Sequence, residues 1–178
     1  DLDDKTSGFQ NGDLIIIAGR PGMGKTALAL SLVRNAAVDH KVGVGMFSLE
    51  MANHQLAMRL LCSEARVDSH LVRTGSLPKT HWKNLSLSVG PLSEAPIYFD
   101  DTPALTVLEL RAKARRLKAE FNIGMIVVDY LQLMQGPRGT ESRQQEISVI
   151  SRSLKALAKE LNIPVVAVSY THIRDHET

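Results

Sequence analysis

Short apolar runs and amphipathic segments alternate along this chain of 178 residues. Continuous runs rich in Val and Ile are typical of strands buried on both faces of a parallel sheet. We predict such strands at 14–18, 42–49, 97–99, 125–131 and 164–169. Between them, apolar residues recur at spacings of three and four, which predicts helices. These helices are expected at 25–38, 53–65, from Pro78 onward, at 107–121 and around 147–161. The alternation predicts an α/β fold in which helices flank a largely parallel sheet.

Some positions within these segments predict details of packing. Gly43 and Gly45 should allow another element to approach the second strand closely. Asn53 is a candidate cap for the helix that follows it. The helix after Pro78 should have Trp82, Leu85 and Val89 on the same side. Because the chain ends soon after its last predicted strand, we expect that strand near an open edge of the sheet and more sequence to complete the domain.

Composition indicates the number of domains and the cellular compartment of the protein, but no activity. The length suits one domain with one core, and no apolar run is long enough for a membrane helix. The first residues are polar and acidic, which is unlike a secretory signal. The single cysteine, Cys62, lies in an apolar helical stretch, so we expect a core residue in a cytoplasmic protein. A net charge of +2 neither requires nor excludes nucleic acid.

One loop carries a phosphate-binding pattern. The segment GRPGMGKT follows the first predicted strand, opens the first helix, and matches G-x-x-x-x-G-K-[ST] without a gap. Its glycines let consecutive N–H groups face phosphate oxygens at a helix N-terminus, and a glycine-rich turn without a ligand is the alternative. Lys25 would contact the β- and γ-phosphates of ATP, and the Thr26 hydroxyl would bind Mg²⁺. The predicted nucleotide-binding residues are Gly19, Arg20, Pro21, Gly22, Met23, Gly24, Lys25 and Thr26.

Two carboxylates follow predicted strands. Asp129 ends the run IVVD, where P-loop proteins place an Asp beside the Mg²⁺ ion, here through a water, although a turn cap is the alternative. Glu50 follows the strand that contains MFSL, and a glutamate there can deprotonate the water that attacks the γ-phosphate. A solvated or helix-capping glutamate is the alternative. Because the carboxyl ends of parallel strands share one edge, we expect Lys25, Glu50 and Asp129 to face one cleft.

Four segments together resemble one family. GRPGMGKT, FSLEM, VVDYLQLM and SRSLKALAKELNIPVV occur in the order and spacing typical of the ATPase domain of DnaB-like bacterial replicative helicases. The resemblance covers about residues 1–169, and FSLEM and DYLQLM are far more specific than the phosphate loop. It implies a RecA-like P-loop NTPase fold and a ring of six subunits with ATP at their interfaces. It also implies duplex unwinding by 5′ to 3′ movement on single-stranded DNA, Glu50 as catalytic base, and a primase and a helicase loader as partners.

In such a ring the loop after the Asp129 strand faces the central channel. This loop is about 135–143, and its Arg138 and Arg143 would follow DNA phosphates without reading sequence. A solvated loop is the equal alternative. The helix at 107–121 carries a further basic group, which we expect on its solvated side, with a subunit contact as the alternative. This group comprises Arg111, Lys113, Arg115, Arg116 and Lys118.

The sequence departs from the family pattern after Ser169. Tyr170 stands where the family has a Gln that senses the γ-phosphate, and residues 170–178 form an atypical tail. His172 and His176 in this tail have the spacing of metal ligands on a helix, but we expect no metal there. The resemblance implies that the family's second DNA-contacting loop and its arginine finger lie beyond the end of this sequence. Residues 1–169 are therefore expected to be an ATPase core that is incomplete at its C-terminus.

Three functions are compatible with these observations. The first is the ATP-hydrolysing motor of a replicative helicase, with slow turnover on its own because an arginine finger contributes roughly 10³ to 10⁵ in rate. The second is a RecA-type recombinase or a clock-like ATPase, against which FSLEM and DYLQLM argue. The third is a nucleotide-binding assembly module without turnover. We favour the first.

Overall fold

A computed structural model describes residues 7–136 and 142–170. Five strands form one sheet in the order β1-β5-β4-β2-β3, and every pair of neighbours is parallel. The strands are β1 (Leu14–Gly19), β2 (Val44–Ser48), β3 (Ile97–Asp100), β4 (Met125–Asp129) and β5 (Val165–Tyr170). The predicted α/β fold with a parallel sheet is confirmed.

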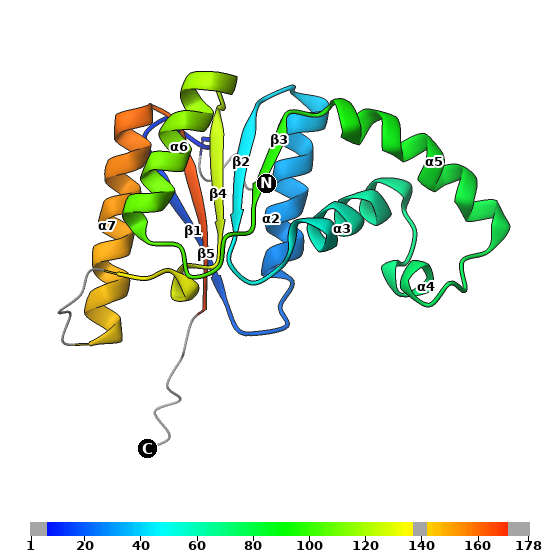
Figure 1. The fold of residues 1–178 in the computed structure, drawn as a ribbon, viewed down its shortest axis with the longest axis horizontal. Helices are drawn as coiled ribbons and strands as arrows, with labels where there is room; N and C mark the ends of the chain where they lie inside the picture. Colours follow the sequence, from blue (N-terminus) through cyan, green and yellow to red (C-terminus); the bar gives the residue numbers. More distant parts are fainter. Residues whose placement is uncertain (1–6, 137–141, 171–178) are drawn as a thin grey trace, which may run out of the picture.

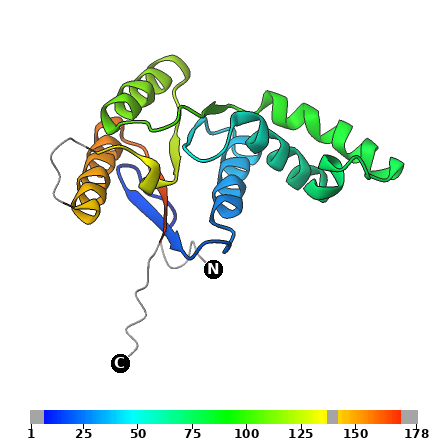
Figure 2. The same cartoon turned by 60° about the horizontal axis from the view of Figure 1, so that its bottom comes forward.

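Helices cover both faces of the sheet (Figure 1). One face carries α6 (Val107–Phe121) and α7 (Arg143–Leu161), and the other carries α2 (Lys25–Arg34), which continues as the π-helical segment Asn35–Asp39. Beyond α2, an arm extends away from the sheet, as Figure 2 also shows. The arm consists of α3 (Asn53–Ala65), α4 (Ser69–Arg73) and α5 (Lys79–Glu94).

The two faces of β4 separate the hydrophobic core into two halves. Ile126 and Val128 pack with α6 and α7, whereas Met125 and Val127 pack with α2 and α3. This alternation is the period-two pattern of a strand buried on both faces. A third, smaller cluster within the arm includes Ala65, Val67, Leu77 and Leu85. The long apolar runs seen in the sequence therefore become the central strands, whose carboxyl ends lie at one edge of the sheet.

The last strand does not lie at an open edge, which corrects a sequence-based expectation. β5 inserts between β1 and β4, so β1 and β3 form the two edges. Residues 165–168 of β5 are completely or almost completely buried, whereas Ile16 of β1 is 44% exposed. Position in the chain did not reveal this, because crossover helices let consecutive strands take non-adjacent places in a parallel sheet.

The arm also differs in detail from the sequence-based expectations. Leu85 is buried, but Trp82 and Val89 are 53% and 50% exposed, because α5 packs on α3 without a second layer beyond it. The residue that caps α3 is Ala52, and Asn53 is the first helical residue. The short helix α4 was not predicted, since its five residues are too few to show a period.

Other packing expectations are confirmed. A Cβ atom on Gly43 would lie 3.1 Å from the Ile123 Cα, and one on Gly45 would lie 3.0 Å from the Leu117 Cδ1. Cys62 is buried and has no disulfide partner. None of the described helices is long and apolar enough to cross a membrane.

The basic residues of α6 lie on its solvated side, as expected, and each also binds a group of its own chain. Arg111 and Arg115 both bind Glu160 of α7, and Lys113 binds Asp100 at the end of β3. The remaining two, Arg116 and Lys118, bind Glu120 and the Ile123 carbonyl.

Candidate nucleotide-binding site

The predicted phosphate loop connects β1 to α2. Its turn depends on two glycines, because Gly22 and Gly24 have φ angles of 75° and 79° in the left-handed region. No atom outside their chain neighbours lies within 4 Å of where a Cβ would stand on either glycine, so the space beside both is open. Helix α2 begins at Lys25, and its free N–H groups face the same space.

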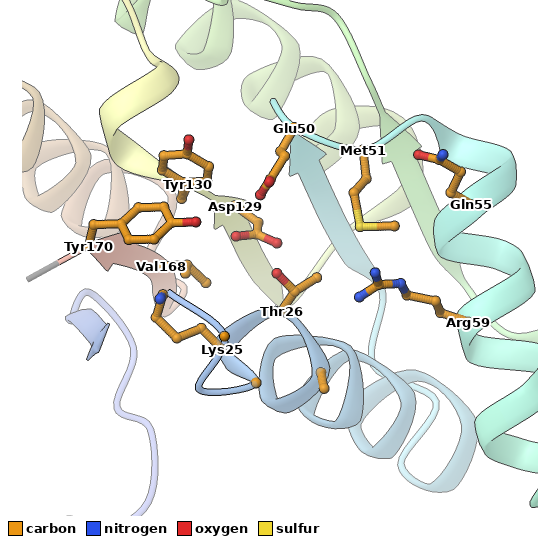
Figure 3. Close-up of a pocket in the computed structure, with 13 residues that line it drawn as sticks. Lys25, Thr26, Glu50, Met51, Gln55, Arg59, Asp129, Tyr130, Val168 and Tyr170 are labelled. Atoms are coloured by element: carbon orange, nitrogen blue, oxygen red, sulfur yellow. The ribbon is translucent and has the colours of Figure 1, made fainter. Parts of the chain in front are cut away.

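Lys25 and Thr26 leave the start of α2 in different directions (Figure 3). The Lys25 Nζ donates hydrogen bonds of 2.8 Å to the carbonyl oxygens of Gly19 and Arg20. The same nitrogen lies 4.1 Å from the centroid of the Tyr170 ring. Thr26 points instead toward Asp129 at the end of β4.

A cleft of about 500 Å³ opens at this edge of the sheet. In the ladder, Ser48 pairs with Asp129, so Glu50 lies just beyond the same edge. Glu50, Asp129, Lys25 and Thr26 all line the cleft, together with Gly22 and Gly24. The structure thus brings together the side chains that the sequence predicted to share a cleft. Arg20, Pro21 and Met23 belong to the outer part of the loop, and Met23 is 74% exposed.

Asp129 is a buried carboxylate that forms no ion pair with any residue in 7–136 or 142–170. Asp129 is 1% exposed. Neither of its carboxylate oxygens has a hydrogen-bond partner within the described segments, although the Thr26 side chain lies beside it. Burial raises the pKa of Asp129, the nearby Glu50 charge raises it further, and Thr26, Lys25 and Arg59 oppose both effects. A buried carboxylate of this kind is stabilised when a cation binds it.

The oxygen atoms of Thr26 and Asp129 suit Mg²⁺. This ion binds hard oxygen ligands and commonly uses one or two protein groups, waters and substrate phosphates. No group of three or more His, Cys, Asp or Glu side chains that could hold a metal ion occurs within residues 7–136 and 142–170. The arrangement therefore fits a cation that arrives with a phosphorylated substrate.

Sequence reasoning missed Arg59, which comes from α3 and lines the cleft opposite Lys25. Gln55 lines it as well, one helical turn earlier. The sequence did carry a signal for these two residues. Gln55 and Arg59 are spaced i and i+4 on the helix directly after Glu50, so they share one face. Only the direction of α3 across the sheet edge shows that this face points into the cleft.

Two tyrosines line the cleft on the side away from Arg59 (Figure 3). The rings of Tyr130 and Tyr170 meet edge to face with 4.6 Å between centroids, and the Asp129–Tyr130 peptide bond is cis. Burial raises the pKa of Tyr130, and the nearby Glu50 charge acts in the same direction. Gln132 fixes the backbone of Tyr170, accepting from its N–H at 3.1 Å and donating to its carbonyl at 3.2 Å.

Of the two predicted DNA contacts, the structure describes only Arg143, which does not line this cleft. Arg138 lies outside the described residues, as do His172 and His176. Arg143 begins α7, forms an ion pair with Glu146, and donates to the carbonyls of Gln132 and Met134. Its guanidinium is therefore engaged by its own chain rather than held free on a loop.

Known proteins with similar sequences are replicative helicases. The chain is 55% identical over 170 residues to replicative DNA helicase DnaB of Geobacillus stearothermophilus, covering 95% of this chain and 37% of that protein. It is 51% identical over 170 residues to replicative DNA helicase DnaC of Bacillus subtilis, with the same two coverages. The chain thus spans little more than a third of the length of these relatives.

Solved structures agree with the sequence matches. The structure of a DnaB-like replicative helicase and its interactions with primase has a TM-score of 0.88 at 33% identity, over 95% of this chain and 41% of that one. An ATPase domain has the same TM-score and identity, over 95% of this chain and 61% of its own. These neighbours confirm the RecA-like ATPase fold. The family model of the DnaB-like helicase C-terminal domain matches residues 1–177, and the chain belongs to this family.

Proposed function

We propose that this chain is the ATP-hydrolysing motor domain of a replicative DNA helicase. In this proposal six subunits form a ring that moves 5′ to 3′ on single-stranded DNA in the cytoplasm and unwinds the duplex. The observation that carries the proposal is the single cleft shared by Lys25, Thr26, Glu50 and Asp129, in a chain of the DnaB-like family. These four side chains supply the groups that phosphoryl transfer from ATP to water requires.

Each group has a distinct role in the proposed reaction. Lys25 places a positive charge against the β- and γ-phosphates, and the N–H groups of residues 19–26 hold the phosphate oxygens. Thr26 would hold Mg²⁺ directly and Asp129 through a water, and the bound ion would neutralise charge on the phosphates. Glu50 is exposed to the cleft, where its carboxylate orients the attacking water and accepts its proton.

Arg59 adds a second positive charge to this site. Its side chain reaches the cleft from α3, on the side opposite Lys25, and its charge lowers the pKa of Asp129. We propose that Arg59 contacts the phosphates of the nucleotide, since a guanidinium suits phosphate oxygens. It does not replace the arginine finger that a neighbouring subunit would supply in a ring.

The partners of the complete protein are part of the proposal. We propose single-stranded DNA in the channel, with Arg138 and Arg143 among its contacts, and a primase and a helicase loader as binding partners. Primase is supported by the neighbouring structure, which concerns a DnaB-like helicase and its interactions with primase. The Arg143–Glu146 ion pair argues that Arg143 contributes less than Arg138 to binding phosphate.

The first experiment measures nucleotide binding. Calorimetry of the 178-residue chain with Mg·ATP should give a dissociation constant on the order of micromolar to millimolar, and Lys25→Ala should weaken binding at least tenfold. Lys83→Ala, in the arm and outside the cleft lining, is the matched control and should change nothing. Equal affinity of the wild type and Lys25→Ala would remove the phosphate loop from the site.

The second experiment separates a motor from a module that only binds nucleotide. The latter is the second candidate, because Tyr170 stands where the family pattern has a Gln. We expect slow hydrolysis by the chain alone and stimulation by single-stranded DNA. Phosphate release should be followed with protein in excess over ATP, with and without an oligonucleotide. Binding without any release over many hours would favour the assembly module.

A further inference from the structure

The Lys25 ammonium already has a complete set of partners in this structure. An ammonium has three N–H donors and no acceptor. Two hydrogen bonds of 2.8 Å go to the carbonyl oxygens of Gly19 and Arg20, within the loop itself. The third side faces the Tyr170 ring, whose centroid lies 4.1 Å away. In this position Lys25 has no unused donor for a phosphate.

Tyr170 is held firmly enough to act as a partner of Lys25. Gln132 binds both the N–H and the carbonyl of Tyr170, and it also donates to the Ser169 hydroxyl at 2.8 Å. On the far side, the Tyr130 ring packs edge to face against the Tyr170 ring at an interplanar angle of 80°. The Tyr170 backbone and ring are therefore both held at the carboxyl end of β5, next to the start of the phosphate loop.

We propose that Tyr170 is a positioning residue that competes with the nucleotide for the Lys25 ammonium. The proposal rests on the nucleotide-binding function proposed above. The two carbonyl partners belong to the loop that would wrap the phosphates, whereas the ring comes from β5, where Tyr170 pairs with Gly19 at the start of that loop. To reach the β- and γ-phosphates, Lys25 must turn away from the ring. Nucleotide binding therefore includes the loss of a cation–π contact, which weakens the observed affinity.

Substitutions at Tyr170 test this competition by calorimetry with Mg·ATP. Tyr170→Leu removes the ring and should bind Mg·ATP roughly two- to fivefold more tightly, the fold-change that corresponds to one partly exposed cation–π contact. Tyr170→Phe keeps the ring and should stay close to the wild type. Tyr98→Leu breaks a stacked aromatic pair away from the cleft, Tyr98 with Phe121, and should leave the affinity unchanged. Unchanged or weaker binding by Tyr170→Leu would overturn the proposal.

A spectroscopic measurement needs no variant and therefore does not depend on the folding of one. In the wild type, the Lys25 ε-methylene protons should be shifted upfield by the current of the Tyr170 ring. Titration with Mg·ATP should move these signals toward the ordinary lysine position. Signals that stay shifted when nucleotide is bound would mean that ring and phosphate share Lys25 without competing, which contradicts the proposal.

Failure of this inference is distinguishable from failure of the proposed function. If Lys25→Ala weakens Mg·ATP binding but Tyr170→Leu does not strengthen it, the site holds nucleotide and Tyr170 is not a competitor. If neither the wild type nor Tyr170→Leu binds Mg·ATP, the nucleotide site itself is wrong. As a further check, Tyr170→Leu should have no effect on affinity when Lys25 is replaced by Met, since the ammonium is then absent.

Discussion

The Arg34 guanidinium of α2 forms a bidentate ion pair with the Glu64 carboxylate of α3, with an Nε–Oε2 distance of 2.6 Å and an Nη2–Oε1 distance of 3.0 Å. The two side chains are only 28% and 19% exposed. Arg34 also binds Asp39 in the π-helical segment. This pair joins the helix that begins with Lys25 to the helix that carries Arg59, so it fixes two walls of the cleft relative to each other.

We expect Glu64→Gln to lower the free energy of unfolding by about 1 kcal/mol at pH 7, because a bidentate charged pair is lost. The hydrogen bond from Arg34 lowers the pKa of Glu64 below its ordinary 4.5. A carboxylate with a lowered folded pKa stabilises the fold above its unfolded pKa and ceases to do so as pH falls through the folded pKa. The difference between wild type and variant should therefore disappear in acid. Urea denaturation at several pH values measures it, and a gap that persists unchanged in acid would contradict this account.

Asp129→Asn should have the opposite effect and stabilise the protein at pH 7, by roughly 1–3 kcal/mol, because an unpaired buried charge is removed. Burial raises the folded pKa of Asp129 above 3.8, so the folded state binds a proton more tightly than the unfolded state. The wild type therefore loses stability as pH rises from the unfolded pKa of Asp129 to its folded pKa. The stabilisation that Asp129→Asn gives should accordingly shrink as pH falls toward 3. Thermal unfolding with Glu94→Gln as an exposed control tests this, and a lower Tm for Asp129→Asn at pH 7 would be the contrary result.

Glu50→Gln should keep Mg·ATP binding and slow hydrolysis by roughly 10² to 10⁴, the usual contribution of a general base. The amide retains the size of the side chain but cannot accept the proton of the attacking water. Single-turnover phosphate release measures the chemical step even when it is slow. Glu94→Gln, in α5 and away from the cleft lining, should behave like the wild type. Normal release by Glu50→Gln would mean that another group activates the water.

Gly43→Ala should destabilise the protein by about 1–3 kcal/mol, the usual effect of overpacking. Its Cβ would meet the backbone of Ile123 at 3.1 Å, where no side chain can swing aside. Gly90→Ala, inside helix α5, is the matched control, because no atom beyond its chain neighbours and the helix's own backbone lies within 4 Å of a Cβ there. Helix propensity favours Ala over Gly at this position, but Pro91 directly after it disfavours a Cβ in helical conformation, so the control should change the free energy of unfolding by less than about 1 kcal/mol. Chemical denaturation compares the two variants, and equal effects would refute the packing argument.

Single-stranded DNA should bind this chain weakly and with strong salt dependence. A net charge of +2 gives no large basic field, and few phosphate contacts are available from one loop. We expect Arg138→Ala to make the plot of log affinity against log salt shallower by about 0.7, the value for one phosphate contact on a single strand. Arg143→Ala should change it less, because Glu146 already binds this guanidinium. Fluorescence anisotropy with Arg116→Ala as control measures both, and tight, salt-resistant binding would indicate a different DNA surface.

The sequence by itself determined the five strands, the longer helices and the phosphate loop, but not the short helix α4. Lys25 and Thr26 were identified because the pattern is contiguous and local, and strand and helix periods bounded it on both sides. The expectation that Glu50 and Asp129 share the cleft also followed from sequence, since parallel strands end at one edge. Their roles in binding Mg²⁺ and activating water stay predictions, as does the boundary between residues 1–169 and the tail.

Only the tertiary structure decided which side chains from distant segments meet. Strand order placed β5 inside the sheet, which brought Tyr170 over Lys25. The direction of α3 brought Arg59 into the cleft, and the lack of a second layer left Trp82 exposed on the arm. The physical reason is the same in each case. Periodicity shows which face of a segment is apolar, whereas the partner of that face depends on crossovers and packing between residues far apart in the chain.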